Sequence, residues 1–159
     1  MEGKKTYLKE YYQTDEIQQM IDWENIMKMP RYAGGHDDQM RGLFKNAHVV
    51  AHWNEEDYQG SVATCVQLSN GKYAIYNDYY GSCSGCDAWE DATDEEVKNM
   101  CVNLSNSTYV FHSLNDVIRF LKNASNIDES YSWKGACSSE LLKIIVEFKR
   151  CVIIEKIEL

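Results

Sequence analysis

Apolar and polar residues alternate along the central part of the chain, a pattern that predicts β-strands. The alternation is clearest over residues 60–68, where one side carries Val62, Thr64, Val66 and Leu68. Apolar stretches at 47–54 and 72–78 flank this segment, and Asn70-Gly71 predicts a type I′ hairpin turn in which both central residues have positive φ. We therefore expect three consecutive antiparallel strands.

Beyond residue 92 the apolar period becomes that of an amphipathic helix. Thr93 and Glu96 have the spacing of a capping box. Behind them the apolar residues fall at i, i+3, i+4 and i+7, namely Val97, Met100, Cys101 and Leu104. A second helix is expected after Ser113 and a third over 138–148, while residues 109–112 and 151–157 predict short strands.

Residues 1–42 have a weaker pattern and predict an N-terminal helical arm followed by a loop. Thr14 can cap a helix that Pro30 ends, and Gly34-Gly35 marks the loop at 30–42. Residues 43–159 form the body, and the two parts are expected to make one cooperative domain. The predicted fold class is α+β: a mainly antiparallel sheet, with a three-stranded meander plus one or two further strands, and helices packed on one face.

The net charge of the chain indicates which classes of partner it can bind. The chain of 159 residues has 25 Asp and Glu against 16 Lys and Arg, a net charge of −9. Direct binding of nucleic acid is not expected, because phosphate contacts need a cationic face. The first residues contain no apolar signal segment and no run is long enough to span a membrane, so we expect a soluble, cytoplasmic protein with no membrane partner. In that compartment the six cysteines would be thiols or metal ligands.

The most unusual segment is 76–96, which combines a C-x-x-C pair, glycines, aromatic residues and carboxylates. Gly81 and Gly85 permit tight turns around Cys83 and Cys86. We predict that the segment is an ordered, outward-facing contact site for a basic surface of a protein partner, extended by the acidic turn before the second strand. The predicted contact residues are Asp78, Tyr79, Tyr80, Cys83, Cys86, Asp87, Trp89, Glu90, Asp91, Asp94, Glu95, Glu55, Glu56 and Asp57.

Two other functions stay open for this segment. Cys83 and Cys86 have the spacing of a zinc knuckle, but the sequence offers no second pair, only isolated histidines. A redox or nucleophilic thiol is disfavoured, because the surrounding carboxylates oppose thiolate formation. Alternatively, backbone donors of the glycine-rich loop could hold a small molecule.

Common signatures of nucleotide-binding enzymes and hydrolases are missing from the sequence, which favours a binding protein over an enzyme and gives no reason to expect a cofactor. Carboxylates interspersed with aromatic rings can imitate the charge pattern of nucleic acid. The predicted function is therefore a small acidic inhibitor that occupies a basic protein surface. Its sharper form is a nucleic-acid mimic of phage or mobile-element origin that blocks a host defence enzyme.

Overall fold

The computed structural model describes residues 15–31, 36–55, 59–81, 89, 91–124, 133 and 136–158. Its centre is a four-stranded antiparallel sheet in the order β1-β2-β3-β4. The strands are β1 (His48–Asn54), β2 (Gln59–Gln67), β3 (Tyr73–Gly81) and β4 (Tyr109–Phe111). The predicted meander and the short strand after residue 108 are confirmed, as is the α+β class.

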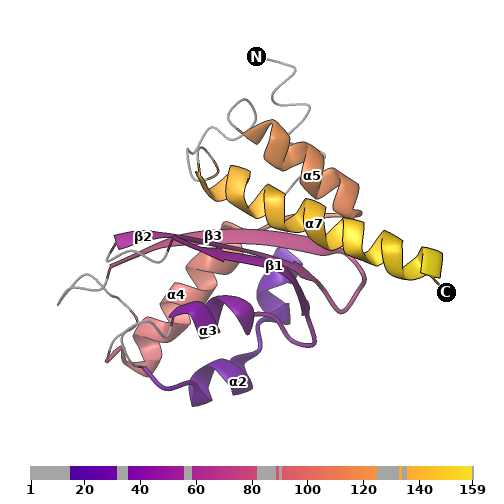
Figure 1. Cartoon of the computed structure of the whole chain (residues 1–159). Helices are drawn as coiled ribbons and strands as arrows, with labels where there is room; N and C mark the ends of the chain where they lie inside the picture. Colours follow the sequence, from indigo (N-terminus) through magenta and orange to yellow (C-terminus); the bar gives the residue numbers. More distant parts are fainter. Residues whose placement is uncertain are drawn as a thin grey trace, which may run out of the picture.

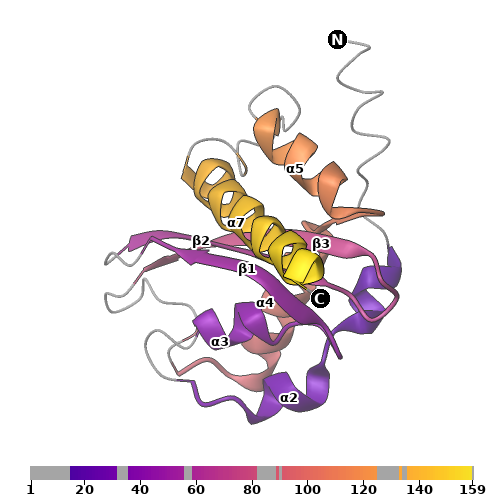
Figure 2. The ribbon, with the colours of Figure 1, turned by 45° about the vertical axis from the view of Figure 1, so that its right-hand side comes forward.

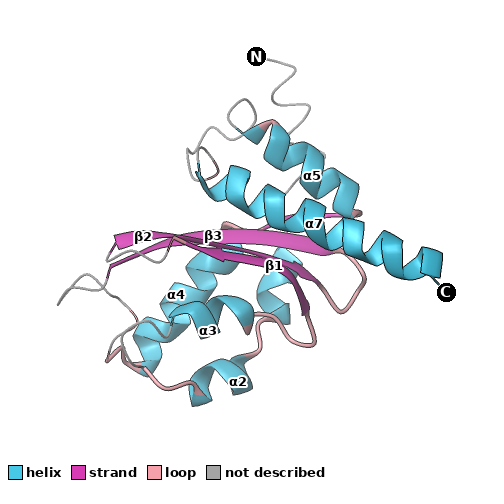
Figure 3. Cartoon of the chain, viewed as in Figure 1, coloured by secondary structure: helices cyan, strands magenta, loops and turns pink. Residues whose placement is uncertain are grey.

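Helices cover both faces of this sheet (Figures 1 and 3). One face carries α5 (Leu114–Lys122) and α7 (Ala136–Glu158), which we call the α5–α7 layer. The other carries η1 (Asp15–Met20), α2 (Trp23–Lys28), α3 (His36–Arg41) and α4 (Asp94–Asn106), which we call the η1–α4 layer. The view turned by 45° shows the same two layers (Figure 2). The sequence predicts helices over one face, and the structure adds a second layer.

Two separate cores explain this arrangement. The strand β2 buries Ala63 and Cys65 on the α5–α7 side and Val62 and Val66 on the η1–α4 side. Because side chains of a strand alternate between faces, a strand with apolar residues on both sides needs cover on both sides. Val50 is the extra residue of a bulge between Val49 and Ala51, and it joins Ala51 in the α5–α7 core.

The hairpin between β2 and β3 is confirmed, but its turn differs from the predicted type. Within Asn70-Gly71 only Gly71 has a positive φ, of 86°. Gly71 N–H donates to Leu68 O at 2.9 Å, and Leu68 N–H donates to Lys72 O at 2.7 Å. A type I′ turn needs a positive φ at both central residues, and here only Gly71 has one. The type I′ prediction is therefore wrong.

The N-terminal arm packs on the sheet as part of the η1–α4 layer. The single helix predicted up to Pro30 is divided into η1 and α2, because Asp22 N–H donates to Leu43 O and the Asp22 side chain caps α2 through Asn25 N–H. The capping residue Thr14 lies outside the described residues. The expected loop at 30–42 contains α3, which is too short to be stable in isolation and depends on contacts with the sheet.

The predicted strand at 151–157 is wrong, because these residues continue α7. No glycine or proline interrupts residues 136–158, and the apolar residues Leu141, Ile145, Phe148 and Val152 keep helical spacing. The β-branched residues near the C-terminus have a strand preference too weak to end a helix already under way. The last turns of α7 run beyond the sheet (Figure 1).

Candidate functional site

The structure describes both flanks of segment 76–96 but not its middle. Six of the predicted contact residues lie outside the described residues: Glu56, Asp57, Cys83, Cys86, Asp87 and Glu90. The side chain of Tyr80 is also outside them, although its backbone belongs to β3. The prediction for the cysteine pair and its immediate neighbours therefore stays a prediction.

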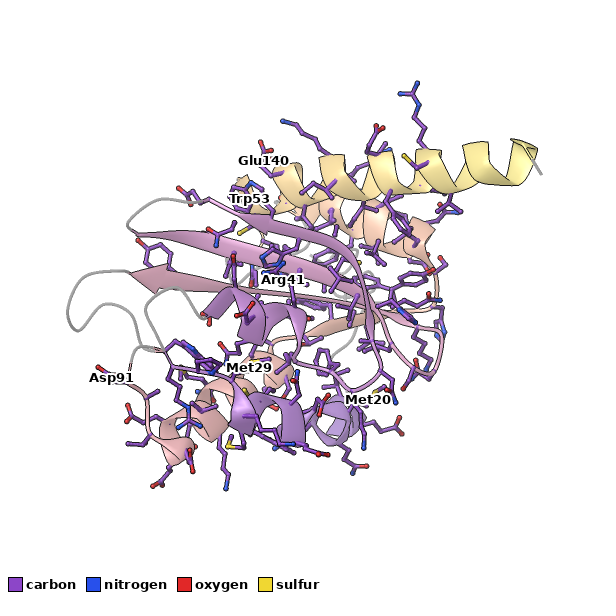
Figure 4. The ribbon with its side chains drawn as sticks, turned by 60° about the horizontal axis from the view of Figure 1, so that its bottom comes forward. Met20, Met29, Arg41, Trp53, Asp91 and Glu140 are labelled. Carbon is purple, nitrogen blue, oxygen red and sulfur yellow. The ribbon has the colours of Figure 1, made fainter. Side chains whose placement is uncertain are left out.

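The C-terminal flank is an acidic turn, defined here as Asp91, Asp94, Glu95 and Glu96. All four side chains are exposed. Figure 4 shows Asp91 at the outer end of the η1–α4 layer, with Glu140 of α7 on the opposite side of the sheet. Asp91 has a φ of 55°, a left-handed conformation that aspartate tolerates better than most residues.

Some of these carboxylates have a structural role at the start of α4. Glu96 N–H donates to Thr93 Oγ1 at 3.2 Å, and Thr93 N–H donates to Glu96 Oε1 at 3.2 Å, so the predicted capping box is confirmed. Carboxylates in the first turn of α4 also interact favourably with the positive end of the helix dipole. Asp91, Asp94 and Glu95 are therefore the carboxylates that a partner could contact without undoing this cap.

Trp89 fixes the acidic turn to the body instead of contacting a partner. Its side chain is 1% exposed and belongs to the core of the η1–α4 layer. The indole N–H donates to Pro30 O at 3.1 Å. The prediction of Trp89 as an exposed anchor is wrong. Burial of this large apolar ring is favourable once its single polar group, the indole N–H, has a hydrogen-bond acceptor.

Arg31 provides a second attachment, which no pattern in the sequence indicates. Its guanidinium Nη1 donates to Ala92 O at 3.0 Å and lies 2.6 Å from Asp94 Oδ1, while its carbonyl accepts from Asp91 N–H at 3.0 Å. The arginine is about sixty positions before these partners in the sequence, and no local pattern connects them. The acidic turn is thus held at several points and presents its carboxylates in a defined arrangement.

The other flank of the segment is the end of β3, beside the C-terminal half of α4. A groove of about 320 Å³, here called the β3–α4 groove, is lined by Asn77, Asp78, Tyr79, Met100, Asn103, Leu104 and Ser107. Tyr79 is 65% exposed, and its backbone N–H donates to Asp78 Oδ1 at 2.8 Å. Of these two predicted contact residues, Asp78 lies on the face of the sheet that carries Val62, Tyr76 and α4, whereas the exposed side chain of Tyr79 lies on the opposite face.

Glu55 lies at the same end of the sheet, because the strand register places Ser61 opposite Tyr79. Glu55 accepts from Ser61 N–H through Oε2 at 3.0 Å, and its own N–H donates to Ser61 O at 3.0 Å. The exposed Glu55 carboxylate thus stabilises the end of the β1–β2 hairpin by accepting a backbone hydrogen bond. It also adds negative charge near β3. A side chain at Gly60 would collide with it, since an added Cβ would lie 2.9 Å from the Cβ of Glu55.

A polar network between β1 and α3 has the residue types of a catalytic relay but not the access. His52 Nδ1 lies 2.9 Å from Thr64 Oγ1, and His52 Nε2 lies 3.0 Å from Asp37 Oδ1. Asn54 Nδ2 donates to the same Asp37 oxygen at 2.8 Å. Thr64 is 0% exposed, so its hydroxyl cannot reach a substrate. The network instead attaches α3 to the sheet.

The described cysteines give no reactive thiol pair. Cys65 and Cys101 are core residues, as predicted, and Cys137 is also buried, whereas Cys151 is exposed. Burial raises the pKa of the thiols of Cys65, Cys101 and Cys137, which keeps them protonated. Among the described residues no group of three or more His, Cys, Asp and Glu side chains is placed to hold a metal ion. Within the same part of the chain, no helix combines the length and apolar character needed to cross a membrane.

A smaller pocket of about 180 Å³ opens beside η1, at the hairpin end of the sheet. Its lining combines apolar residues such as Ile17, Met20 and Leu68 with Glu16, Lys72 and His112. These side chains have mixed charge and belong to a region far from segment 76–96 in the fold. The pocket therefore adds nothing to the predicted contact site.

Comparison of this chain with known proteins gives no match. The chain matches no protein-family model, and neither the curated proteins nor the solved structures contain a significant match to it. Its function must therefore be argued from its own residues.

Proposed function

We propose that this chain is a binding protein that places the acidic turn and the adjoining β3–α4 groove against a basic surface of a protein partner. The observation that carries the proposal is that exposed carboxylates, Asp91, Asp94 and Glu95, are held on a rigid base. Trp89 and Arg31 attach this turn to the body through part-buried side-chain hydrogen bonds and through a backbone hydrogen bond from Asp91 N–H to Arg31 O. A preorganised charged surface binds better than a mobile one, because less conformational entropy is lost on association.

The distribution of charge between the two helical layers supports the same surface. The four helices of the η1–α4 layer contain eight carboxylates and three Lys or Arg residues. The two helices of the α5–α7 layer contain five carboxylates and six Lys or Arg residues. The negative field is therefore concentrated on one side of the molecule, where it would speed and orient the approach of a cationic partner.

Nucleic-acid mimicry is the sharper form of this proposal. It requires that the partner use the same cationic surface for DNA or RNA and for this protein. The exposed carboxylates of the acidic turn supply the negative charge that a mimic needs. Competition between the protein and duplex DNA or RNA for the captured partner separates this form from a simple acidic binding protein.

Capture of the partner from an extract of the native host, with two charge-matched variants, tests the proposal. In the first variant the acidic turn is neutralised by Asp91→Asn, Asp94→Asn and Glu95→Gln. In the control the same number of carboxylates is removed from the α5–α7 layer by Asp116→Asn, Glu140→Gln and Glu147→Gln. We expect a partner that the natural protein and the control both retain, that the first variant loses, and that elutes steeply with salt.

Two results would contradict the proposal. A partner retained equally by both variants would show that charge on this surface is not what is recognised. Retention that does not change between low and high ionic strength would exclude a mainly electrostatic contact, because exposed charges are screened beyond about 10 Å at 0.1 M salt.

A further inference from the structure

We infer that the pocket beside η1 binds a small carboxylate, a molecule with one carboxylate group and a short apolar body. The pocket, called the η1 pocket below, lies between η1, the β2–β3 hairpin and the end of β4. Figure 4 shows Met20 of η1 at the end of the η1–α4 layer opposite to Asp91. The site is therefore separate from the acidic turn, and the inference goes beyond the proposed function.

Two basic side chains lie next to each other in the η1 pocket. The last residue pair between β3 and β4 is Tyr73 and Phe111. Lys72 precedes this pair and His112 follows it, so both lie where the two strands separate, and both line the pocket. Among the described residues, neither the Lys72 ammonium nor the His112 ring has a hydrogen-bond or ion-pair partner. Neighbouring basic groups on adjacent strands repel each other when both are charged, and an anion bound between them would relieve that repulsion.

Asn70 adds a neutral donor to the same part of the pocket. Its Oδ1 accepts from Lys72 N–H at 3.0 Å, which leaves the amide Nδ2 as a donor. The backbone here is fixed by hydrogen bonds from Leu68 N–H to Lys72 O at 2.7 Å and from Gly71 N–H to Leu68 O at 2.9 Å. A carboxylate has about four acceptor positions on its two oxygens, so it can accept from all three side chains.

The rest of the η1 pocket is mainly apolar. Ile17 and Leu68 are buried in the core of the η1–α4 layer, and Met20 and Val110 are half-buried against that core. An apolar ligand body would remove the open surface of these two half-buried side chains from water. The volume of about 180 Å³ equals that of about six water molecules in the liquid, which suits a ligand of about six to eight non-hydrogen atoms.

Glu16 favours an anion with a single charge. It lines the same pocket, and no ion pair among the described residues joins it to Lys72 or His112. Its carboxylate would repel a bound anion, and by Coulomb's law the repulsion is about twice as large for a phosphate dianion as for a carboxylate. Together with the apolar lining, this charge makes an apolar carboxylate a better ligand than inorganic phosphate.

Two molecules of the same shape, 4-methylpentanoate and its uncharged analogue 4-methylpentanamide, test the inference. Their dissociation constants for the full chain would be measured at neutral pH by NMR titration, from the shifts of the backbone amides of Asn70 and Gly71. We expect a dissociation constant of about 1 mM or lower for the carboxylate. The amide should bind at least about tenfold more weakly, because hydrogen bonds to an ionised acceptor are the stronger ones.

Variants of the lining residues connect this preference to the η1 pocket. Lys72→Met and His112→Phe each remove a donor while keeping the size of the side chain, and each should weaken carboxylate binding about fivefold without affecting the amide. Glu16→Gln should strengthen carboxylate binding about twofold, because it removes the repelling charge. The matched control is Lys98→Gln, which removes an exposed lysine of α4 outside the pocket and should change neither affinity.

Several results would overturn the carboxylate site. These are equal affinity for the two molecules, no binding of either at about 10 mM, and a preference that survives Lys72→Met and His112→Phe together. Should that double variant fail to fold, Glu16→Gln decides, since weaker or unchanged carboxylate binding in this variant would also contradict the site. Inorganic phosphate that binds as tightly as 4-methylpentanoate would show a general anion site in which the apolar lining has no role, and would overturn the inference as well.

Discussion

The two helical layers of this protein are attached to one sheet in different ways. The α5–α7 layer is held mainly by rings and aliphatic side chains: Phe120 contacts Tyr109, Phe111 and Trp133 at centroid distances of 4.9, 5.6 and 6.4 Å. The η1–α4 layer also has an apolar core, but hydrogen bonds between distant segments determine where its short helices lie. The layer that carries the candidate site is therefore the one positioned by polar contacts.

The polar attachments of the η1–α4 layer come from several parts of the sequence. Tyr76 of β3 donates its hydroxyl to Met40 O at 2.5 Å, and Gln39 Nε2 donates to Cys101 Sγ at 3.3 Å. Apolar packing is non-directional, whereas a hydrogen bond specifies both distance and angle. This difference predicts that substitutions affect the two layers through different mechanisms and by different amounts.

The largest effect is expected in the α5–α7 layer. Phe120→Ala should lower the free energy of unfolding by about 3–5 kcal/mol, because it leaves a cavity among several rings. Urea unfolding followed by tryptophan fluorescence would measure the change. Phe148→Ala is the matched control, since Phe148 is 39% exposed and should lose less than about 1 kcal/mol. Similar losses for both variants would show that the ring cluster is not the support of this layer.

The next effect concerns the hydrogen bond that holds α3. Tyr76→Phe should destabilise the protein by about 1–3 kcal/mol, because Met40 O would remain buried without this donor. Tyr79→Phe removes the same hydroxyl from a ring that is 65% exposed and should change stability by less than about 0.5 kcal/mol. If both substitutions were neutral, hydrogen bonding could not be what positions this helix.

Alkaline pH should weaken both layers, since each buries a thiol. Burial raises the pKa of Cys65 on one side of the sheet and of Cys101 on the other. Above about pH 8.5 the unfolded chain loses protons that the folded protein keeps, so the free energy of unfolding falls as pH rises. The slope is at most about 1.4 kcal/mol per pH unit for each thiol.

Urea unfolding at several pH values between 8 and 10 would measure this slope. Cys65→Ala and Cys101→Ala should each make it shallower, whatever they do to stability at neutral pH. An unchanged slope in both variants would assign the alkaline loss to other groups, of which the buried phenol of Tyr76, with its raised pKa, is the first to consider.

The smallest effects are expected at the helix caps, where the layers should behave alike. Thr93 caps α4 and Ser113 caps α5, each through a side-chain oxygen that accepts a backbone N–H at 3.2 Å. Thr93→Ala and Ser113→Ala should each lower the free energy of unfolding by about 1 kcal/mol. A much larger loss for Thr93→Ala would show that the acidic turn depends on its capping box more than on Trp89 and Arg31.

The candidate site was predictable only in part. Exposure of Asp78, Tyr79 and the acidic turn agrees with the sequence analysis, because charged residues beside a helix cap are rarely buried. The burial of Trp89 was not predictable, since its partner Pro30 belongs to a segment with no regular pattern near it. The same is true of Arg31 and of the groove, which exists only where β3 and α4 meet.

By itself, the sequence determined the features that depend on neighbours along the chain. The alternation over β2, the glycine after Asn70 and the two helix caps are local preferences, and each led to the right kind of element. The tertiary structure decided the rest: the second helical layer, the division between η1 and α2, the formation of α3 and the last turns of α7. These depend on contacts between residues far apart in sequence, whose free energies outweigh weak local preferences once the sheet has formed.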